Sequence, residues 1–267
     1  MNRSISFVKA TACGNDFILI DGALADDAER KTITQKICDR HLGVGADGVE
    51  WLFPSDKADV YAQLINSDGS DAEVSGNGTR CAAAWQAWKN ASGNAQPVIR
   101  VLTDAGVKAC ELVRRQETVF EFRSDMGEAK IDGEVSIELR AGTKRGIRLS
   151  VGNPQFIVFV DDFAADWQAE GAEIERHRDF PQGTNVEFVK VKSPDEIEIR
   201  IFERGAGETL SSGTGSCASA VAAIYTGRAK SPVRVVSPGG PQTLEWDGKS
   251  MFLTGPAQIL GRGEFFL

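Results

Sequence analysis

The stretch that decides the fold of this chain is Phe202–Ala220, which reads FERGAGETLSSGTGSCASA. Glu203 and Arg204 form a candidate ion pair at its start, and a glycine-rich turn follows. The SGTG run at 212–215 then opens a series of small residues that predicts a helix. Glycines let a backbone approach a ligand closely, and the free N–H groups of a helix start attract anions. Alone the signal is weak, because short glycine-rich turns before helices are common.

A second copy of this stretch lies 137 residues earlier, at Ile65–Ala83, which reads INSDGSDAEVSGNGTRCAA. At that offset the SGNG run at 75–78 aligns with SGTG at 212–215, and Asn66 aligns with Glu203. The VE pair at 49–50 aligns with VE at 186–187, and a slip of one residue brings GN at 14–15 onto GN at 152–153. We infer an internal duplication, in which each half contributes a helix start to a shared cleft.

Composition limits the classes of protein that this chain can belong to. A hydrophobic content of 42% and a charged content of 25% are typical of a soluble globular protein. The net charge of −8 argues against a nucleic-acid or anionic-membrane partner, which would require a basic face. No apolar run is long enough to span a membrane, and the first residues lack the apolar core of a signal peptide. We expect a cytoplasmic protein.

The cysteines and histidines exclude several kinds of site. Five scattered cysteines predict reduced thiols rather than a disulfide framework, and Cys13, Cys38 and Cys110 are expected to be buried. No CxxC pair occurs, and the chain has only two histidines, so no metal-ligand spacing is found. The sequence therefore predicts no metal site.

Strand patterns outnumber helix patterns along the chain. An amphipathic helix is expected at Thr32–Arg40, and buried helices at Cys81–Trp88 and Ser216–Thr226. Trp85 and Trp88 are expected in the core. The C-terminal region predicts separate strands, including Met251–Thr254 and Glu264–Leu267. The expected fold is α+β, with two pseudo-symmetric halves that each wrap a mixed β-sheet or barrel around a central helix. The N-terminal half comprises residues 1–117 and 262–267, and the C-terminal half residues 118–261.

At these residues the chain resembles the diaminopimelate epimerase family along nearly its whole length. The motifs that carry the resemblance are GNDF at 14–17, DRHLGVGADG at 39–48, NSDGS at 66–70, GNGTRC at 76–81, GNP at 152–154, GTNVE at 183–187 and ERGAGET at 203–209. Seven motifs in this order are highly specific for the superfamily and less specific for the substrate.

The resemblance implies a cofactor-free inversion at the α-carbon of an amino acid, with diaminopimelate as the first candidate substrate. In the family, one cysteine thiolate removes the α-proton and an opposed cysteine thiol delivers a proton to the other face. Inversion by one-proton exchange needs a base on one side and an acid on the other. The substrate-binding residues that the resemblance implies are Asn15, Asn66, Gly76, Asn77, Asn153, Asn185, Glu203, Arg204, Gly213 and Thr214.

The two catalytic cysteines of the family fall on Ser75 and Ser212 in this sequence. Cys81 and Cys217 match the second, non-catalytic cysteines, and they lie too far inside their helices to substitute. A helix start can tune a thiol of pKa about 8.5 to the thiolate, whereas a serine hydroxyl is a far weaker acid. Gln155 and Gly48 also depart from residues that many relatives carry, a histidine and a glutamine.

Three interpretations follow. The first is an amino-acid epimerase of the diaminopimelate type, in which the serines transfer protons or replace the original cysteines. The second is a relative with another substrate, such as a racemase or a dehydratase, and the third is a binding protein that has lost catalysis. A small amino acid is the expected ligand, and the resemblance makes a homodimer possible.

Overall fold

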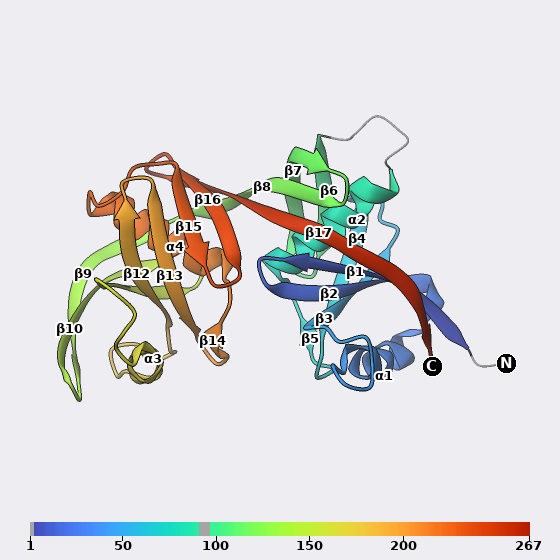
Figure 1. Cartoon of the computed structure of the whole chain (residues 1–267), viewed down its shortest axis with the longest axis horizontal. Coiled ribbons are helices and arrows are strands. Elements are labelled where there is room, and N and C mark those ends of the chain that lie inside the picture. Colours follow the sequence, from blue (N-terminus) through green and yellow to red (C-terminus); the bar gives the residue numbers. More distant parts are fainter. Residues whose placement is uncertain (1–2, 91–96) are drawn as a thin grey trace. The chain divides into compact units, whose positions relative to one another are not determined.

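The computed structural model describes residues 3–90 and 97–267. The chain divides into two compact units, and each is described here by itself (Figure 1). Unit 1 consists of Met1–Ser124 and Gly255–Leu267, and unit 2 consists of Asp125–Thr254.

Unit 1 is a mixed sheet wrapped around one helix. Its elements are β1 (Ser4–Ala12), β2 (Asn15–Asp21), α1 (Asp27–Cys38), β3 (Gly48–Phe53), β4 (Val60–Asn66), β5 (Asp71–Ala72), α2 (Gly76–Lys89), β6 (Val98–Thr103), β7 (Gly106–Gln116), the first part of β8 (Val119–Glu128) and most of β17 (Ser250–Phe266). Strand β2 runs parallel to β3, and β4 runs parallel to β6, whereas β1 pairs antiparallel with both β2 and β17.

Helix α2 is the centre of unit 1 because it is apolar on nearly every side. Cys81 and the three alanines that follow it are completely buried against strand residues that include Phe120 and Phe122. Short alanine side chains let the strands approach the helix from several directions, which is typical of a helix surrounded by a sheet.

Helix α1 packs on a second core cluster of unit 1, where Ile33 and Ile37 meet Trp51 of β3. The predicted start of this helix at Thr32 is wrong. Asp26 accepts a hydrogen bond from the backbone N–H of Glu29 at 2.9 Å, so the helix begins five residues earlier, at Asp27. An aspartate N-cap of this kind satisfies one of the free N–H groups of the first turn.

Unit 2 repeats the plan of unit 1 with its own elements. They are β9 (Lys130–Leu139), β10 (Gly142–Ser150), β11 (Pro154–Phe159), α3 (Trp167–Glu175), β12 (Asn185–Ser193), β13 (Glu196–Glu203), β14 (Gly207–Thr209), α4 (Gly213–Tyr225), β15 (Val233–Ser237) and β16 (Gly240–Trp246). Strand β11 runs parallel to β12, and β13 runs parallel to β15. The pairs β9–β10, β10–β11, β12–β13, β13–β14 and β15–β16 are antiparallel.

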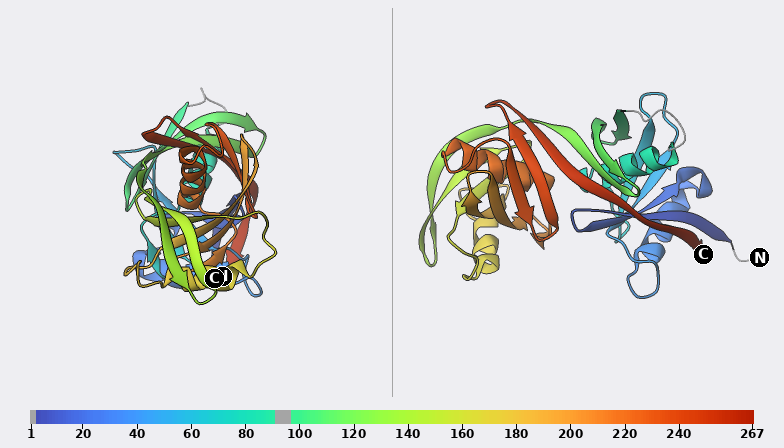
Figure 2. Two further views of the ribbon diagram at one scale, coloured as in Figure 1. Left: turned by 90° about the vertical axis from the view of Figure 1, so that its left-hand side faces the viewer. Right: turned by 45° about the horizontal axis from the view of Figure 1, so that its top comes forward.

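Helix α4 is the centre of unit 2. Residues 217–223 are buried, and they pack against the alternating isoleucines of β13, Ile197, Ile199 and Ile201. The left view of Figure 2 shows this helix with strands on either side of it. The predicted alternation of β13, with isoleucines inward and Glu198 and Arg200 outward, is confirmed. Each unit is therefore a mixed sheet around one central helix, and the predicted α+β fold is confirmed.

Strand β17 differs from the prediction of separate C-terminal strands. Its first residues pair with β16 as far as Thr254, and its last residues pair with β1 from Gln258 onward. The Gly255-Pro256 pair lies between these two runs of pairing. Proline is tolerated in a strand where its missing N–H is not required by a partner, so the strand continues through it.

Candidate active site

Ser75 and Ser212 occupy equivalent positions at the starts of the two central helices. Both have extended backbone conformations and act as N-caps. The hydroxyl of Ser75 accepts from the N–H of Gly78 at 3.1 Å, and that of Ser212 accepts from the N–H of Gly215 at 3.2 Å. Serine is a favoured N-cap because its oxygen satisfies a free N–H of the first turn. Each hydroxyl is thereby held beside the positive end of a helix.

A carboxylate lies beside Ser212. The Ser212 hydroxyl donates to Oε2 of Glu203 at 3.3 Å, and it lies 3.3 Å from the hydroxyl of Thr214. The other carboxylate oxygen of Glu203 accepts from the hydroxyl of Thr209 at 2.7 Å. The end of β13, strand β14 and the start of α4 thus bring Glu203, Ser212 and Thr214 together. Sequence analysis assigned Glu203 to the substrate and missed its contact with the serine.

Amide side chains extend this network away from Ser212. Asn153 Nδ2 donates to Thr214 Oγ1 at 3.4 Å, and Gln155 Nε2 donates to Asn153 Oδ1 at 2.8 Å. With the Gln155 amide in the opposite orientation, its nitrogen instead donates to the two carboxyl oxygens of Glu187 at 2.9 and 3.0 Å. Gln155, noted in the sequence only as a departure from the family, therefore links Asn153 to a buried acid.

Asn185 and Arg204 lie at the same end of unit 2, and backbone groups occupy the amide of Asn185. Its Nδ2 donates to the carbonyl of Pro154 at 3.0 Å, and its Oδ1 accepts from the N–H of Arg204 at 3.0 Å. The guanidinium of Arg204 donates to the carbonyl of Gln182 at 3.1 Å. In the structure Asn185 joins β11 to the turn after β13, and a ligand contact of either residue stays a prediction.

In unit 1 a parallel network joins Asn15 to Asn77. Asn77 Nδ2 donates to Asn15 Oδ1 at 2.6 Å, and Asn15 Nδ2 donates to the carboxylate of Asp47 at 3.0 Å. Arg80, which is only 4% exposed, donates to Asn77 Oδ1, to the carbonyl of Pro256 and to Cys13 Sγ. Sequence analysis missed Asp47 and Arg80 as partners of these asparagines, although both lie in the quoted motifs.

Asn66 does not belong to this network. Its Nδ2 donates to the hydroxyl of Ser70 at 3.0 Å, and its backbone N–H donates to the carbonyl of Ser70 at 2.9 Å. These two bonds close the turn between β4 and β5, which is an ordinary role for asparagine. Asn66 and Glu203 therefore occupy equivalent positions in the two repeats, but their side chains have different hydrogen-bond partners.

Two buried glutamates lie beneath the helix starts, at equivalent positions of β3 and β12. Glu50 is 2% exposed and Glu187 is fully buried. A Cβ on Gly78 would lie 2.0 Å from Oε1 of Glu50, and one on Gly215 would lie 2.7 Å from Oε1 of Glu187. Only glycine leaves room for a carboxyl group at these places in the first helical turn.

Burial favours the protonated form of both acids. Loss of hydration raises the pKa of Glu50 to about 8. It also raises the pKa of Glu187 well above its usual value, and the negative charge of Glu203 adds to the effect. The repeat analysis aligned these two residues without giving them a role, because a sequence does not show which glutamate is buried.

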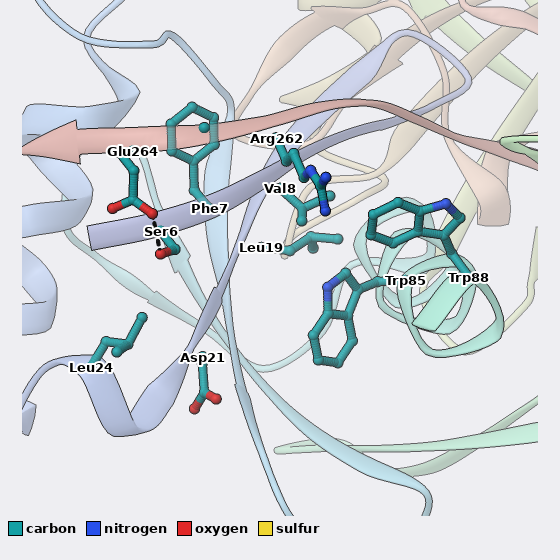
Figure 3. Close-up of a pocket in the computed structure, with 11 residues that line it drawn as sticks. Ser6, Phe7, Val8, Leu19, Asp21, Leu24, Trp85, Trp88, Arg262 and Glu264 are labelled. Carbon is teal, nitrogen blue, oxygen red and sulfur yellow. Dashed lines mark hydrogen bonds between the residues drawn. The ribbon is translucent and has the colours of Figure 1, made fainter. Parts of the chain in front are cut away.

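A pocket of about 570 Å³ lies elsewhere on unit 1 (Figure 3). Trp85 and Trp88 of α2 line it, together with Arg262 of β17 and Val8 of β1. The expectation that both tryptophans lie in the core is therefore wrong, because each is only partly buried. None of the predicted site residues lines this pocket.

The part of the chain that the structure describes contains no cluster of three or more His, Cys, Asp or Glu that could hold a metal ion. All five cysteines are buried, including the three expected to be so, and none is in a disulfide. No helix in residues 3–90 or 97–267 is long and apolar enough to cross a membrane.

Comparison with known proteins identifies the family. The family model described as diaminopimelate epimerase matches residues 7–131 and 148–260. The chain is 40% identical to the diaminopimelate epimerase of Pelotomaculum thermopropionicum, with 97% of this chain and 98% of that relative covered. It is 41% identical to that of Synechococcus elongatus, with 95% of each covered.

Solved structures agree on the fold. A phenazine biosynthesis protein of the PhzF family from Bacillus anthracis superposes with a TM-score of 0.75 at 13% identity, covering 99% of this chain and 100% of that one. A hydroxyproline epimerase from Agrobacterium vitis gives a TM-score of 0.70 at 16% identity, covering 98% and 91%. With the two capped helix starts, the repeated motifs and full-length similarity to named relatives, the chain belongs to the diaminopimelate epimerase family.

Proposed function

We propose that this protein binds diaminopimelate and transfers protons at its α-carbon without a cofactor, with Ser75 and Ser212 in the two proton-transfer positions. The observation that carries the proposal is the pair of capped helix starts, and the serines that cap them are proposed to occupy the reactive positions of the family. Relatives about 40% identical over nearly the whole chain are named diaminopimelate epimerase.

Each unit offers the groups that an amino acid requires. The first-turn N–H groups at residues 76–77 and 213–214 are proposed to bind the carboxylate and the negative charge that develops as the α-proton leaves. Glu203 is proposed to pair with the ammonium group, and Arg204 with a carboxylate. Asn15 and Asn77 in unit 1, and Asn153 in unit 2, are held in hydrogen-bond networks, and we propose that these residues also contact the ligand.

The two serines set the expected rate. A hydroxyl is almost wholly protonated at neutral pH, so it is a far poorer base than a thiolate. A positioned acid or base contributes on the order of a hundred- to ten-thousand-fold to a proton-transfer rate. We therefore expect affinity for diaminopimelate to be retained and epimerisation to be slow.

The test combines binding with proton exchange. Isothermal titration with the LL and meso isomers measures affinity, and loss of the α-proton NMR signal in deuterated water measures exchange. The double variant Ser75→Cys/Ser212→Cys is expected to epimerise at least a hundred-fold faster than the serine form, with each single variant in between. Rapid epimerisation by the serine form would overturn the expected rate, and absence of binding would overturn the proposed substrate.

We also propose that the protein works in a reducing compartment such as the cytoplasm. Five buried cysteines, none of them in a disulfide, support this location.

A further inference from the structure

A chain of polar side chains leads from a buried acid of β12 to the start of α4. Glu187 and Gln155 are both completely buried, and the atom of the Gln155 amide that faces away from Asn153 lies 2.9 and 3.0 Å from the two carboxyl oxygens of Glu187. On its other side Gln155 Nε2 donates to Asn153 Oδ1 at 2.8 Å, and Asn153 Nδ2 donates to Thr214 Oγ1 at 3.4 Å. All four residues belong to unit 2.

The order of donors and acceptors along this chain depends on whether Glu187 carries a proton. As a carboxylate Glu187 only accepts, so the oxygen of the Gln155 amide cannot face it without bringing two acceptors together. As a carboxylic acid it has one O–H, which donates to that oxygen and leaves the Gln155 nitrogen to donate to Asn153. The hydrogen bonds from Gln155 to Asn153 and from Asn153 to Thr214 therefore belong to the protonated acid.

Loss of this proton reverses the chain. The Gln155 nitrogen then donates to both carboxylate oxygens, at 2.9 and 3.0 Å, and its oxygen turns to Asn153. Asn153 must turn as well, because two amide oxygens would otherwise face one another. It then presents its carbonyl oxygen to Thr214, whose hydroxyl can donate as well as accept. The only bond that breaks is the O–H bond of Glu187, and its proton passes to solvent.

Burial and charge favour the proton on Glu187. Loss of hydration raises its pKa well above the ordinary value, and the negative charge of Glu203 at the end of β13 adds to this effect. Strand β11 and helix α4, within the bounds given above, contain no acidic, basic or histidine side chain, and Cys217 is the titratable residue in the buried part of α4. On β13, Glu198 and Arg200 pair with each other on the outer face.

We propose that Glu187 and Gln155 are positioning residues: the proton on Glu187 holds the Asn153 amide with its NH₂ group toward the start of α4, and loss of that proton turns the carbonyl oxygen there instead. The inference rests on the proposed function and deepens it, because it names what sets the polarity of one ligand-binding side chain. An NH₂ group beside the first-turn N–H groups favours a carboxylate, whereas a carbonyl oxygen repels one. Binding of the ligand carboxylate should therefore weaken as Glu187 loses its proton.

The corresponding amides of unit 1 are fixed at both ends, which makes them an internal control. Arg80, which can only donate, bonds to Asn77 Oδ1, and Asn77 Nδ2 donates to Asn15 Oδ1. Asn15 Nδ2 donates to the carboxylate of Asp47, which pairs with Arg40 at 2.7 Å. A donor at one end and an acceptor at the other allow one orientation of both asparagines, so these amides should not follow the protonation of Glu187.

The first measurement uses the protein without ligand. The carboxyl carbon signal of Glu187 and the side-chain amide signals of Gln155 and Asn153 are followed by NMR from about pH 5 to about pH 10. We expect both amide signals to shift with the midpoint of Glu187, while those of Asn15 and Asn77 do not. Amide signals that ignore this midpoint, or a Glu187 that keeps its proton throughout the range, would overturn the inference.

The second measurement is titration calorimetry with the LL and meso isomers of diaminopimelate over the same range of pH. The affinity of the parent should fall by on the order of ten-fold or more across the titration of Glu187. Glu187→Gln keeps a donor beside Gln155 at every pH, so it should retain the low-pH affinity and lack this fall. Gln155→Met breaks the link and should bind more weakly at low pH, also without the fall. The control Glu208→Gln neutralises an exposed carboxylate of β14 and should behave as the parent does.

The outcomes separate the two proposals. Binding whose pH dependence is the same in the parent and in Glu187→Gln would overturn the positioning role and leave the substrate proposal standing. Failure to bind either isomer would overturn the substrate proposal, while the amide signals of Gln155 and Asn153 still test the positioning role. A merely structural role predicts that Glu187→Gln and Gln155→Met lower the urea midpoint of unfolding and leave the pH dependence of affinity unchanged, and that result would also overturn the inference.

Discussion

Replacing Glu50 by glutamine should change how the stability of the protein depends on pH. The carboxyl group is 2% exposed, and burial raises its pKa from 4.5 to about 8. Between these values the folded protein holds a proton that the unfolded chain has released. The contribution of Glu50 protonation to the free energy of unfolding should therefore be fully present below pH 4.5 and be lost progressively as the pH rises toward 8.

The size of the effect follows from the width of this window. Each unit of pH costs about 1.4 kcal/mol for one proton, so a window of about 3.5 units amounts to about 5 kcal/mol at most. Glutamine has nearly the shape of the protonated acid and cannot ionise. Glu50→Gln should therefore lack this part of the pH dependence, and its stability relative to the parent should increase between pH 4.5 and pH 8.

The assay is urea denaturation of both proteins at half-unit steps of pH, followed by tryptophan fluorescence. The quantity compared is the difference in unfolding free energy between Glu50→Gln and the parent, and the slope of this difference against pH. A difference that is constant with pH would reflect only how well the glutamine amide packs in place of the carboxyl group. The exposed Glu208→Gln provides the control and should show no such slope. Parallel curves for Glu50→Gln and the parent would refute the assignment of a protonated Glu50.

Further predictions concern the same region of unit 1. Gly78→Ala should destabilise the protein by about 1–3 kcal/mol, because the added Cβ would lie 2.0 Å from Glu50 Oε1. The control is Gly76→Ala, whose added Cβ would have no atom within 4 Å and should not destabilise the protein, and chemical denaturation measures both variants. Arg80→Met leaves the buried Oδ1 of Asn77 without this donor and should cost about 1–3 kcal/mol, measured in the same way. Burial raises the pKa of Cys38 to about 12, so this thiol should resist alkylation in the native protein and react rapidly in denaturant, as peptide mass spectrometry would show.

The central helices and their caps could be predicted from the sequence because their signals are local. Serine followed by a glycine-rich turn and a run of small residues specifies an N-cap and a buried helix, and the repeat at Ser75 and Ser212 doubles the signal. Strand β17 could not be predicted as one element. Its continuity depends on a change of partner from β16 to β1 around Pro256, and that change is a property of the folded sheet.

The boundaries between the two halves, placed near residues 117 and 261, stay predictions. The sequence marks no boundary there because strands cross from one compact unit into the other. Strands β8 and β17 run on without a turn or linker where the compact units change, so the sequence contains no break to mark.

The candidate site was only partly accessible to sequence reasoning. Motifs identified the residues, but their partners come from other elements, as with Arg80 on Asn77 or Gln155 on Glu187. The contact between Glu203 and Ser212 depends on the way β14 returns along β13, which no local pattern states.

The pairing of β1 with β17 has a consequence for synthesis. Ser4 lies opposite Phe266 and Thr11 opposite Gln258. Strand β1 therefore cannot form its pairing with β17 until almost the last residues of the chain have left the ribosome. Residues 125–254, by contrast, form a continuous compact unit that is complete earlier. In a chain whose synthesis stops before residue 255, unit 2 would therefore contain all its strands from β9 to β16. Unit 1 would still lack the part of β17 that pairs with β1. Premature termination near the end should consequently damage the earlier-made half more than the later one.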